Sequence, residues 1–165
     1  MCGITGLYCL GDERRVDSAV LIRMRDTMVH RGPDGGEVFG SPDRRVGLAH
    51  RRLSIIDLSA AATQPMPNED ETVGGTFNGE TYNHQSLRPV LEAAGHDFRT
   101  DHSDTEVIIH GYEEWGLEGL VKRLDGDYAI GLWHSRKESL FLIRDRAGVK
   151  PLYFSLQSGM LLFAS

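Results

Sequence analysis

The chain has 165 residues, which is long enough for one domain with a sizeable hydrophobic core. Hydrophobic residues make up 40% and charged residues 25%, an ordinary globular mixture that does not indicate disorder. The formal net charge of −6 argues against nucleic acid as a main partner, because phosphate binding needs a basic face. No stretch approaches the roughly 20 apolar residues of a membrane helix, and the first residues do not resemble a signal peptide. We therefore expect a cytoplasmic protein with no membrane partner.

The elements expected in the first half begin with a strand and an amphipathic helix. The helix is indicated by apolar residues at helical spacing, and the loops by glycine, proline and asparagine. Asn-Gly is a strong hairpin signal, so the strand before it is expected to end in a turn. In chain order these elements are a strand at 3–9, a helix at 17–29, a loop at 30–36, a strand at 45–57, a loop at 59–71, and a strand at 72–77 with its turn at Asn78-Gly79.

The second half starts with helices and ends in strands. A helix at 84–94 should stop at Gly95, and Pro89 should delay its start or bend it. Ser103 and Glu106 have the spacing of a capping box, which predicts a helix that Gly116 closes. The remaining expected elements are a short helix at 117–123 and strands at 127–134, 139–144, 151–156 and 160–164. This order favours one mixed α+β domain over residues 1–165 and excludes a strictly parallel βαβ pattern.

The two cysteines, Cys2 and Cys9, fall at the ends of the first expected strand region. On one strand they would lie about 23 Å apart, well beyond the ~7 Å between Cα atoms that a disulfide allows. We therefore expect two free thiols. The histidines show no H-E-x-x-H pattern or other tight ligand spacing, so no metal site is expected.

Cys2 becomes the first residue of the chain if the initiator methionine is removed. It would then carry a thiol with a reference pKa of about 8.5 and an α-amine with one of about 7.7–8.0. The amine can accept the thiol proton and later donate one to a leaving amine, so a single residue supplies nucleophile and base. The alternative is that Cys2 is simply the second residue, with no chemical role.

A nucleophile of this kind needs an oxyanion hole, and a charged amino-acid substrate needs partners at both ends. Asn78-Gly79 offers a side-chain amide and an unobstructed backbone N–H, although such a pair taken alone is more often an ordinary hairpin turn. Arg52 is a candidate for the α-carboxylate. Asp104 and Glu80 are candidates for the α-ammonium, but Asp104 could instead complement a helix dipole. Alternation places Arg51 and Arg52 on opposite faces of a strand, so only one of them can face a substrate.

Several segments in chain order support a resemblance to a known family. They are MCGITGLY at 1–8, HRGPD at 30–34, LAHRRLSIID at 48–57, QPM at 64–66, FNGETYN at 77–83, SDTEV at 103–107 and RDRAGVKPLY at 144–153. Together they resemble the N-terminal glutaminase domain of glutamine-hydrolysing asparagine synthetases, a class II glutamine amidotransferase domain. The HRGPD version is typical of the asparagine synthetase branch. Thr81 and the segment 126–134 depart from the usual family pattern.

The resemblance implies a four-layer αββα sandwich of the N-terminal-nucleophile hydrolase type, in which Cys2 attacks the side-chain amide of L-glutamine. It also implies roles for individual residues. Asn78 and Gly79 would hold the oxyanion, Arg52 would bind the substrate carboxylate, and Glu80 and Asp104 would bind the ammonium. The supporting residues would be the backbone of Leu53, Ser54, Ile55 and Ile56 beside the substrate, and Arg31 and Gly32 near the Cys2 amine.

In this family the sequence continues into a synthetase domain that uses ATP and Mg²⁺, whereas the present domain is expected to need no cofactor. Its expected partner is the synthetase domain or subunit that receives ammonia, so we expect either an excised domain or a stand-alone glutaminase subunit. A homodimer stays open, as does the identity of the ammonia acceptor, whether aspartate or another carboxylate. Two other functions stay open as well: a catalytically degenerate docking module and a hydrolase acting on a different amide.

Overall fold

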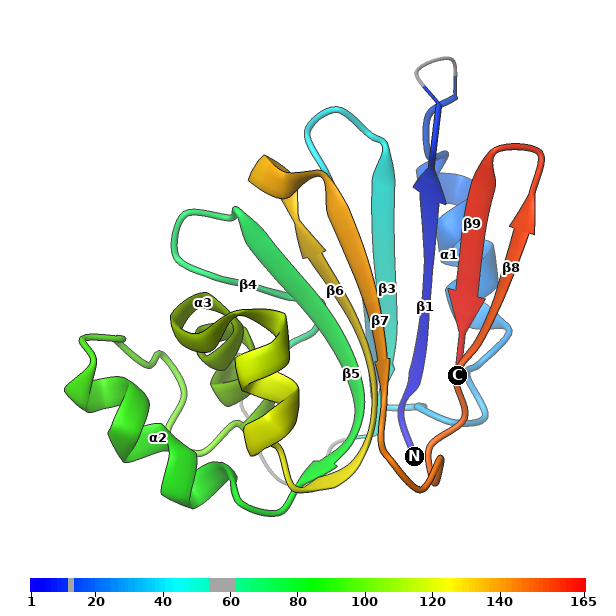
Figure 1. Cartoon of the computed structure of the whole chain (residues 1–165). Helices are drawn as coiled ribbons and strands as arrows, with labels where there is room; N and C mark the ends of the chain where they lie inside the picture. Colours follow the sequence, from blue (N-terminus) through cyan, green and yellow to red (C-terminus); the bar gives the residue numbers. More distant parts are fainter. Residues whose placement is uncertain (12–13, 54–61) are drawn as a thin grey trace.

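The computed structural model describes residues 1–11, 14–53 and 62–165. Two antiparallel sheets form its centre (Figure 1). The strands of the first sheet, in spatial order, are β2 (Gly35–Gly40), β3 (Val46–Arg52), β1 (Gly3–Cys9), β9 (Met160–Ala164) and β8 (Tyr153–Gln157). Those of the second sheet are β4 (Met66–Pro67), β5 (Val73–Thr81), β6 (Gly126–His134) and β7 (Ser139–Arg144), and a short 3-10 helix, η2 (Ser135–Lys137), joins the last two.

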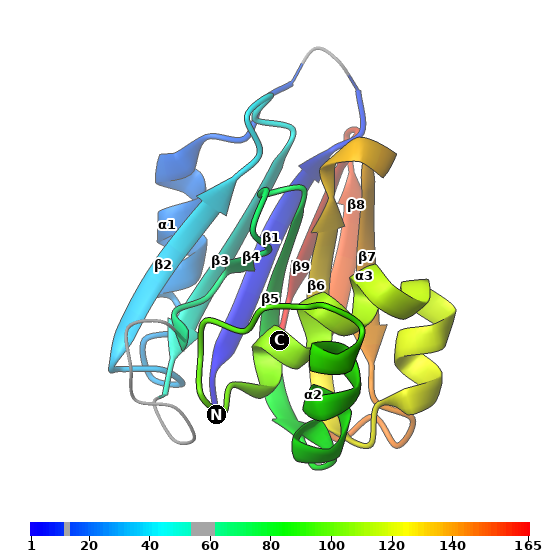
Figure 2. The same cartoon turned by 90° about the vertical axis from the view of Figure 1, so that its left-hand side faces the viewer.

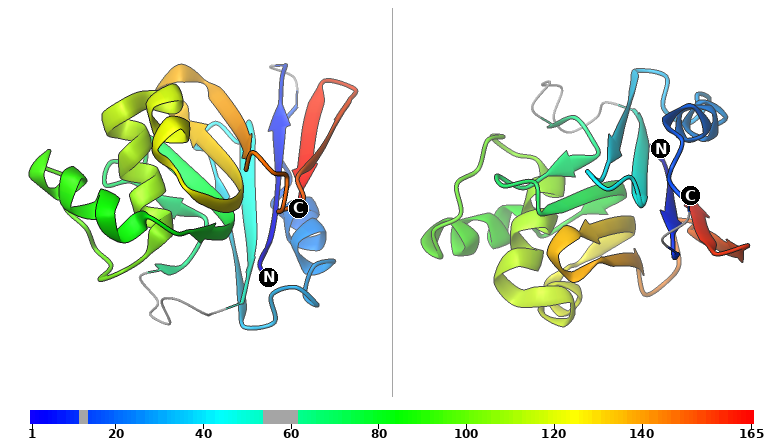
Figure 3. Two further views of the ribbon diagram at one scale, coloured as in Figure 1. Left: turned by 60° about the horizontal axis from the view of Figure 1, so that its bottom comes forward. Right: turned by 90° about the horizontal axis from the view of Figure 1, so that it is seen from above.

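The layers follow from which face each strand residue presents. Even-numbered residues of β1 and β3, such as Ile4 and Leu48, face the second sheet, and they form one cluster with Trp133 of β6 and Phe163 of β9. Odd-numbered residues such as Leu7 and Ala49 face α1 (Ser18–Asp26) on the outer side. A third apolar cluster joins β5 and β6 to α3 (Asp104–Arg123), beside which α2 (His84–Ala93) packs. The fold is therefore the expected four-layer αββα sandwich (Figure 3).

Helices α2 and α3 cover the end of the second sheet that lies nearest the N-terminus (Figure 2). The expected break at Gly116 is present, with a left-handed φ of +66° that interrupts α3. Pro89 lies inside α2, which nevertheless starts at His84 as expected, so the prediction of a delayed start is wrong. In the part of the chain that the structure describes, no helix is long and apolar enough to span a bilayer.

The most consequential wrong prediction concerns Asn78-Gly79, which is not a hairpin turn. Both residues lie inside β5, opposite Ala129 and Tyr128 of β6. The glycine instead allows β5 and β6 to approach closely. A Cβ at position 79 would overlap the carbonyl oxygen of Asp127 and lie 2.8 Å from the Cα of Tyr128. Asn-Gly is therefore a strand feature here, and it carries the Asn78 side chain on a rigid element.

Other boundaries also differ from the sequence predictions. β2 begins within a predicted loop and continues through residues for which the sequence predicted no element. β4 lies in a predicted loop, and α1 ends at Asp26 instead of residue 29. The described part of β3 ends at Arg52, whereas the predicted strand continued to 57. The capping box is absent, because the Ser103 side chain caps nothing and Glu106 accepts hydrogen bonds from the N–H groups of Arg99 and Thr100.

Candidate active site

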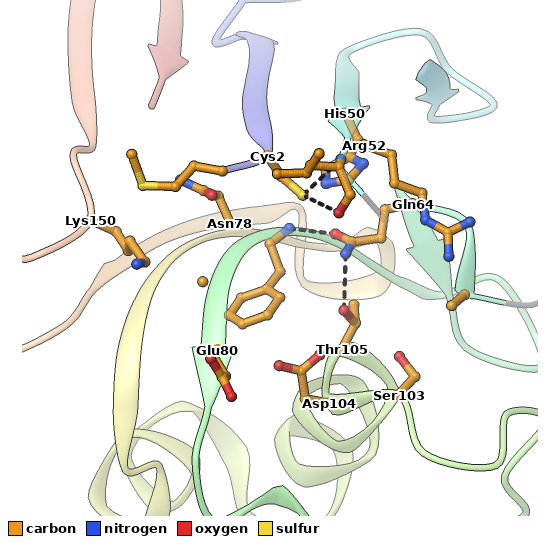
Figure 4. A pocket seen from close by; sticks show the side chains of 15 residues that line it. Cys2, His50, Arg52, Gln64, Asn78, Glu80, Ser103, Asp104, Thr105 and Lys150 are labelled. Atoms are coloured by element: carbon orange, nitrogen blue, oxygen red, sulfur yellow. Dashed lines mark hydrogen bonds between the residues drawn. The ribbon is translucent and has the colours of Figure 1, made fainter. Parts of the chain in front are cut away.

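A cavity of about 190 Å³ opens where the start of β1 and the ends of β3 and β5 meet the first turn of α3 (Figure 4). It brings together residues that are far apart in the sequence. The lining residues are Met1, Cys2, His50, Arg52, Leu53, Ala62, Gln64, Phe77, Asn78, Gly79, Glu80, Ser103, Asp104, Thr105 and Lys150.

Cys2 precedes β1 and is half-buried at the mouth of this cavity. The β1–β3 register pairs Gly3 with Arg51, which brings Cys2 beside the end of β3. The Leu53 N–H donates to the Cys2 Sγ over 3.3 Å, and the thiol lies 3.6 Å from the Leu53 carbonyl oxygen. The sulfur is thus held by the backbone and directed into the cavity (Figure 4). Met1 also lines the cavity, and while it is present the Cys2 nitrogen is an amide.

Asn78 contributes a side chain that is only 1% exposed. Its Nδ2 has no hydrogen-bond partner among the residues that the structure describes. A buried amide donor without a partner costs about 1–3 kcal/mol. Because Asn78 lines the cavity with Cys2, its Nδ2 is available to a polar atom of a bound ligand.

The Gly79 N–H offers a second donor. The opposite residue, Tyr128, directs its N–H and C=O to Asp145, at 3.2 and 2.8 Å, away from β5. The Gly79–Tyr128 pair is consequently a non-hydrogen-bonded pair of the antiparallel ladder, and the Gly79 N–H points away from β6. That direction is the side of the cavity, so a side-chain donor and a backbone donor lie next to each other in the sequence.

Of the two neighbouring arginines, Arg52 lines the cavity. Arg51 extends to the opposite face, where its Nε donates to the Gly32 carbonyl over 2.8 Å and its Nη1 lies 3.8 Å from Asp26. The structure thus separates them as strand alternation required. A guanidinium in the cavity can bind a carboxylate with two parallel hydrogen bonds.

Two carboxylates lie on the opposite side of the cavity from Arg52. Asp104 begins α3 and is 6% exposed, and its Oδ2 accepts a hydrogen bond from the Thr81 N–H over 3.1 Å. Burial raises the pKa of Asp104, against the lowering effect of hydrogen bonds from the Thr81, Asp104 and Thr105 N–H groups and of His84. A buried carboxylate with a raised pKa favours a nearby cation. Glu80 is exposed at the rim and lies on the same side (Figure 4).

The remaining predicted site residues lie outside the cavity or outside the described residues. Gly32 is buried against the β3 backbone, and a Cβ there would overlap the Arg51 carbonyl. Arg31, whose buried Nη2 has no partner among the described residues, precedes it. Gly32 is thus placed against the end of β3, and neither residue lines the cavity. Ser54, Ile55 and Ile56 fall outside the described residues.

Known proteins match this chain throughout its length. A family model described as a glutamine amidotransferase domain matches residues 1–165. The chain belongs to the glutamine amidotransferase domain family. Asparagine synthetase [glutamine-hydrolyzing] 3 of Bacillus subtilis (strain 168) is 38% identical to the amidotransferase domain over 167 residues, which is 100% of this chain and 26% of that protein. Asparagine synthetase [glutamine-hydrolyzing] of Sandersonia aurantiaca is 43% identical over 153 residues, covering 93% of this chain and 28% of that protein.

The amidotransferase domain therefore spans about a quarter of the length of these curated relatives. A solved structure of glutamine phosphoribosylpyrophosphate amidotransferase from B. subtilis, complexed with ADP and GMP, has a TM-score of 0.77 to it. The match covers 99% of this chain and 41% of that chain at 19% identity, so the likeness concerns the fold.

Sequence reasoning about the amidotransferase domain missed several residues that line the cavity. His50 is 1% exposed, and burial, reinforced by the charges of Arg52 and Arg51, lowers its pKa to about 4, so its imidazole is neutral at pH 7. Alternation along β3 could have found it, because His50 and Arg52 share a face. Gln64, Thr105 and Lys150 were quoted within family-like segments without a role of their own. No local pattern indicates that these three meet Cys2.

One group of side chains in the amidotransferase domain has the composition of a metal site. His96, His110 and Glu113 place one potential ligand atom each within 4.8 Å of one another, although their sequence spacing suggested no such group. His110 already interacts with carboxylates there, with its Nδ1 lying 3.2 Å from Glu113. Burial alone would lower the pKa of His110, but Glu106, Glu113 and Glu69 outweigh it and raise the pKa to about 9. A protonated imidazole is not a metal ligand.

Proposed function

We propose that this domain hydrolyses the side-chain amide of L-glutamine to glutamate and ammonia through a thioester on Cys2. The observation that carries the proposal is the composition of one small cavity. It holds a thiol, a buried amide donor on Asn78 that has no partner among the described residues, and opposite charges on Arg52 and Asp104. Glutamine has complementary groups: a carboxylate, an ammonium and an amide carbonyl that becomes an oxyanion when a nucleophile adds.

The reaction begins after Met1 has been removed, when the Cys2 α-amine accepts the thiol proton. The sulfur adds to the amide carbon, and the oxyanion that forms is held by the Asn78 Nδ2 and the Gly79 N–H. Collapse of this intermediate breaks the carbon–nitrogen bond, and the protonated amine supplies the proton with which ammonia leaves. Water then adds to the thioester, which releases glutamate and regenerates the thiol.

Substrate orientation follows from the charges around the cavity. Arg52 binds the α-carboxylate with help from the backbone at Leu53, and Asp104 and Glu80 bind the α-ammonium. Residues Ser54, Ile55 and Ile56 remain part of this proposal through the family resemblance. No cofactor takes part in these steps.

The proposed partner of the domain is a synthetase domain or subunit, which receives the ammonia. The curated relatives are asparagine synthetases about four times as long as this chain, so we propose an amidation of the same kind that uses ATP and Mg²⁺ outside this domain. Aspartate and another carboxylate remain alternative acceptors. The acidic net charge agrees with a function that does not involve nucleic acid.

Intact mass combined with a glutaminase assay tests the proposal. We expect active protein to have lost Met1, and Cys2→Ala to abolish glutamate formation while the domain stays folded by circular dichroism. A matched variant keeps the thiol but adds a residue in front of it, which converts the amine to an amide and should also inactivate. Glutamine turnover by Cys2→Ala would refute the nucleophile, and normal turnover by the extended variant would refute the amine as base.

A further inference from the structure

The outer edge of β5 contains a row of backbone N–H groups that lie on the cavity side of the strand. These groups belong to the odd-numbered residues, because Tyr128 turns away from Gly79 and the ladder alternates with a period of two. In order along the strand they are the N–H groups of Val73, Gly75, Phe77, Gly79 and Thr81.

Protein atoms bind the members of this row on both sides of Gly79. The Val73 N–H donates to the Asn68 Oδ1 over 3.0 Å, and Gly75 pairs with Met66 of β4. The Phe77 N–H donates to the Gln64 Oε1 over 2.7 Å. The Thr81 N–H donates to the Asp104 carboxylate. The Gly79 N–H lies between two bound groups and faces the cavity.

Gln64 reaches beyond the strand edge with its other amide atom. Its Nε2 donates to the Thr105 Oγ1 over 3.0 Å, and both side chains are buried, at 8% and 3% exposure for the two residues. Thr105 is the second residue of α3, directly after Asp104. Gln64 therefore joins the strand that carries Asn78 and Gly79 to the helix turn that carries Asp104 (Figure 4).

We propose that Gln64, acting with Thr105, is a positioning residue for the oxyanion hole. It fixes the edge of β5 one position before Asn78 and two before Gly79, so that both donors point at one place near Cys2. The Asp104–Thr81 bond fixes the same edge from the other side. Preorganised donors stabilise a developing oxyanion because they need no reorientation during the reaction. This inference rests on the proposed glutaminase function.

The role of Gln64 predicts a defect in turnover and not in binding. Gln64→Met removes both hydrogen bonds at nearly constant volume, and we expect kcat to fall about tenfold or more, less than the 10²–10³-fold loss typical of deleting a donor. KM should stay within about twofold, because Asp104 keeps its own bond to Thr81. Gln64→Glu retains an acceptor for the Phe77 N–H and can accept from the Thr105 hydroxyl, so it should recover most of kcat.

A second pair of variants tests the link from its other end, in case Gln64→Met folds poorly. Thr105→Val removes the acceptor of the Gln64 Nε2 and should lower kcat, whereas Thr105→Ser retains the hydroxyl and should restore it. Asn68→Ala is the matched control, since Asn68 binds the same strand edge at its far end, outside the cavity. It should reduce thermal stability but leave kcat unchanged.

The outcomes separate this inference from the function on which it rests. Loss of kcat in Gln64→Met and Thr105→Val, with recovery in Gln64→Glu and Thr105→Ser, supports it. Unchanged kcat in both disruptive variants, or a rise in KM without a fall in kcat, overturns it. If wild-type protein lacking Met1 does not hydrolyse glutamine, or if Cys2→Ala does, the proposed function itself fails before any variant of Gln64 is measured.

Discussion

At the scale of single residues, the cavity combines two kinds of groups that should affect catalysis differently. Arg52 and Asp104 carry charges that a bound amino acid would neutralise, and they meet glutamine before and after the oxyanion forms. Asn78 carries a buried donor without a described partner, which gains its full hydrogen bond when negative charge develops. Binding and turnover should therefore depend on different side chains.

Arg52→Ala should raise KM at least about tenfold with a smaller change in kcat, because a charge-assisted pair contributes about 1.5–3 kcal/mol. Asn78→Ala should lower kcat about 10²–10³-fold with little change in KM. Steady-state kinetics with glutamine measure both. Arg51→Ala is the matched control: it removes a neighbouring guanidinium that faces Gly32 and Asp26, so it should alter stability and leave KM unchanged. The reverse assignment of defects to Arg52 and Asn78 would show that their roles are exchanged.

At the scale of elements, hydrophobic periodicity predicted the helices and most of the strands of the sandwich, although not β2 or β4, and the glycine at position 116 predicted the break in α3. Local sequence patterns failed where contacts with distant parts of the chain determine the conformation of a residue. Asn78-Gly79 has the composition of a turn, but β6 approaches so closely that only glycine fits, and the pair continues the strand. Glu106 has the spacing of a capping residue, yet it binds the loop before α3. Local patterns identified Cys2, Arg52 and the two acids of the cavity as candidate site residues. The role of Gln64 depends on its contacts with β5 and α3, which no local pattern shows.

Gly79→Ala tests the close approach of β5 and β6. Its new Cβ would overlap the Asp127 carbonyl, so the strands must separate there. We expect a loss of about 1–3 kcal/mol in the free energy of unfolding, together with a fall in kcat because the Gly79 N–H is displaced. Gly40→Ala is the control, since its Cβ would meet only the Val46 carbonyl, at 4.0 Å. Thermal unfolding and glutaminase kinetics measure both; equal behaviour of the two variants would contradict a special role for Gly79.

At the scale of the whole molecule, polar and charged side chains connect α3 to neighbouring segments at two places, one beside the cavity and one farther along the helix. Its first turn binds the edge of β5 through Asp104 and Thr105. Farther along α3, His110 is 1% exposed and lies 3.6 Å from Glu69, which follows β4, and 3.9 Å from Glu106. Glu106 in turn accepts from the Arg99 and Thr100 N–H groups before the helix. The acid–imidazole cluster of Glu69, Glu106, His110 and Glu113 thus joins separate segments beneath one helix.

The pH dependence of unfolding should report this cluster. The pKa of His110 is raised to about 9 in the folded protein, above its ordinary value of 6.5, so the folded state binds its proton more tightly. The resulting stability is fully present below pH 6.5 and is lost as the pH rises through 9. Between pH 6 and 10, wild type should therefore lose on the order of 1–3 kcal/mol more than His110→Gln.

Urea unfolding of both proteins at several pH values gives this difference, and groups that titrate in both cancel. The stability that the cluster provides is also lost at low pH. Burial favours the protonated form of Glu106, but the nearby His110, 3.9 Å away, and hydrogen bonds from Thr100 and Arg99 outweigh it and lower its pKa to about 2. The stability that Glu106 provides is consequently present above pH 4.5 and lost as the pH falls toward 2. Parallel curves for wild type and His110→Gln across the alkaline range would mean that the imidazole is uncharged at neutral pH and that its charge does not stabilise the packing of α3.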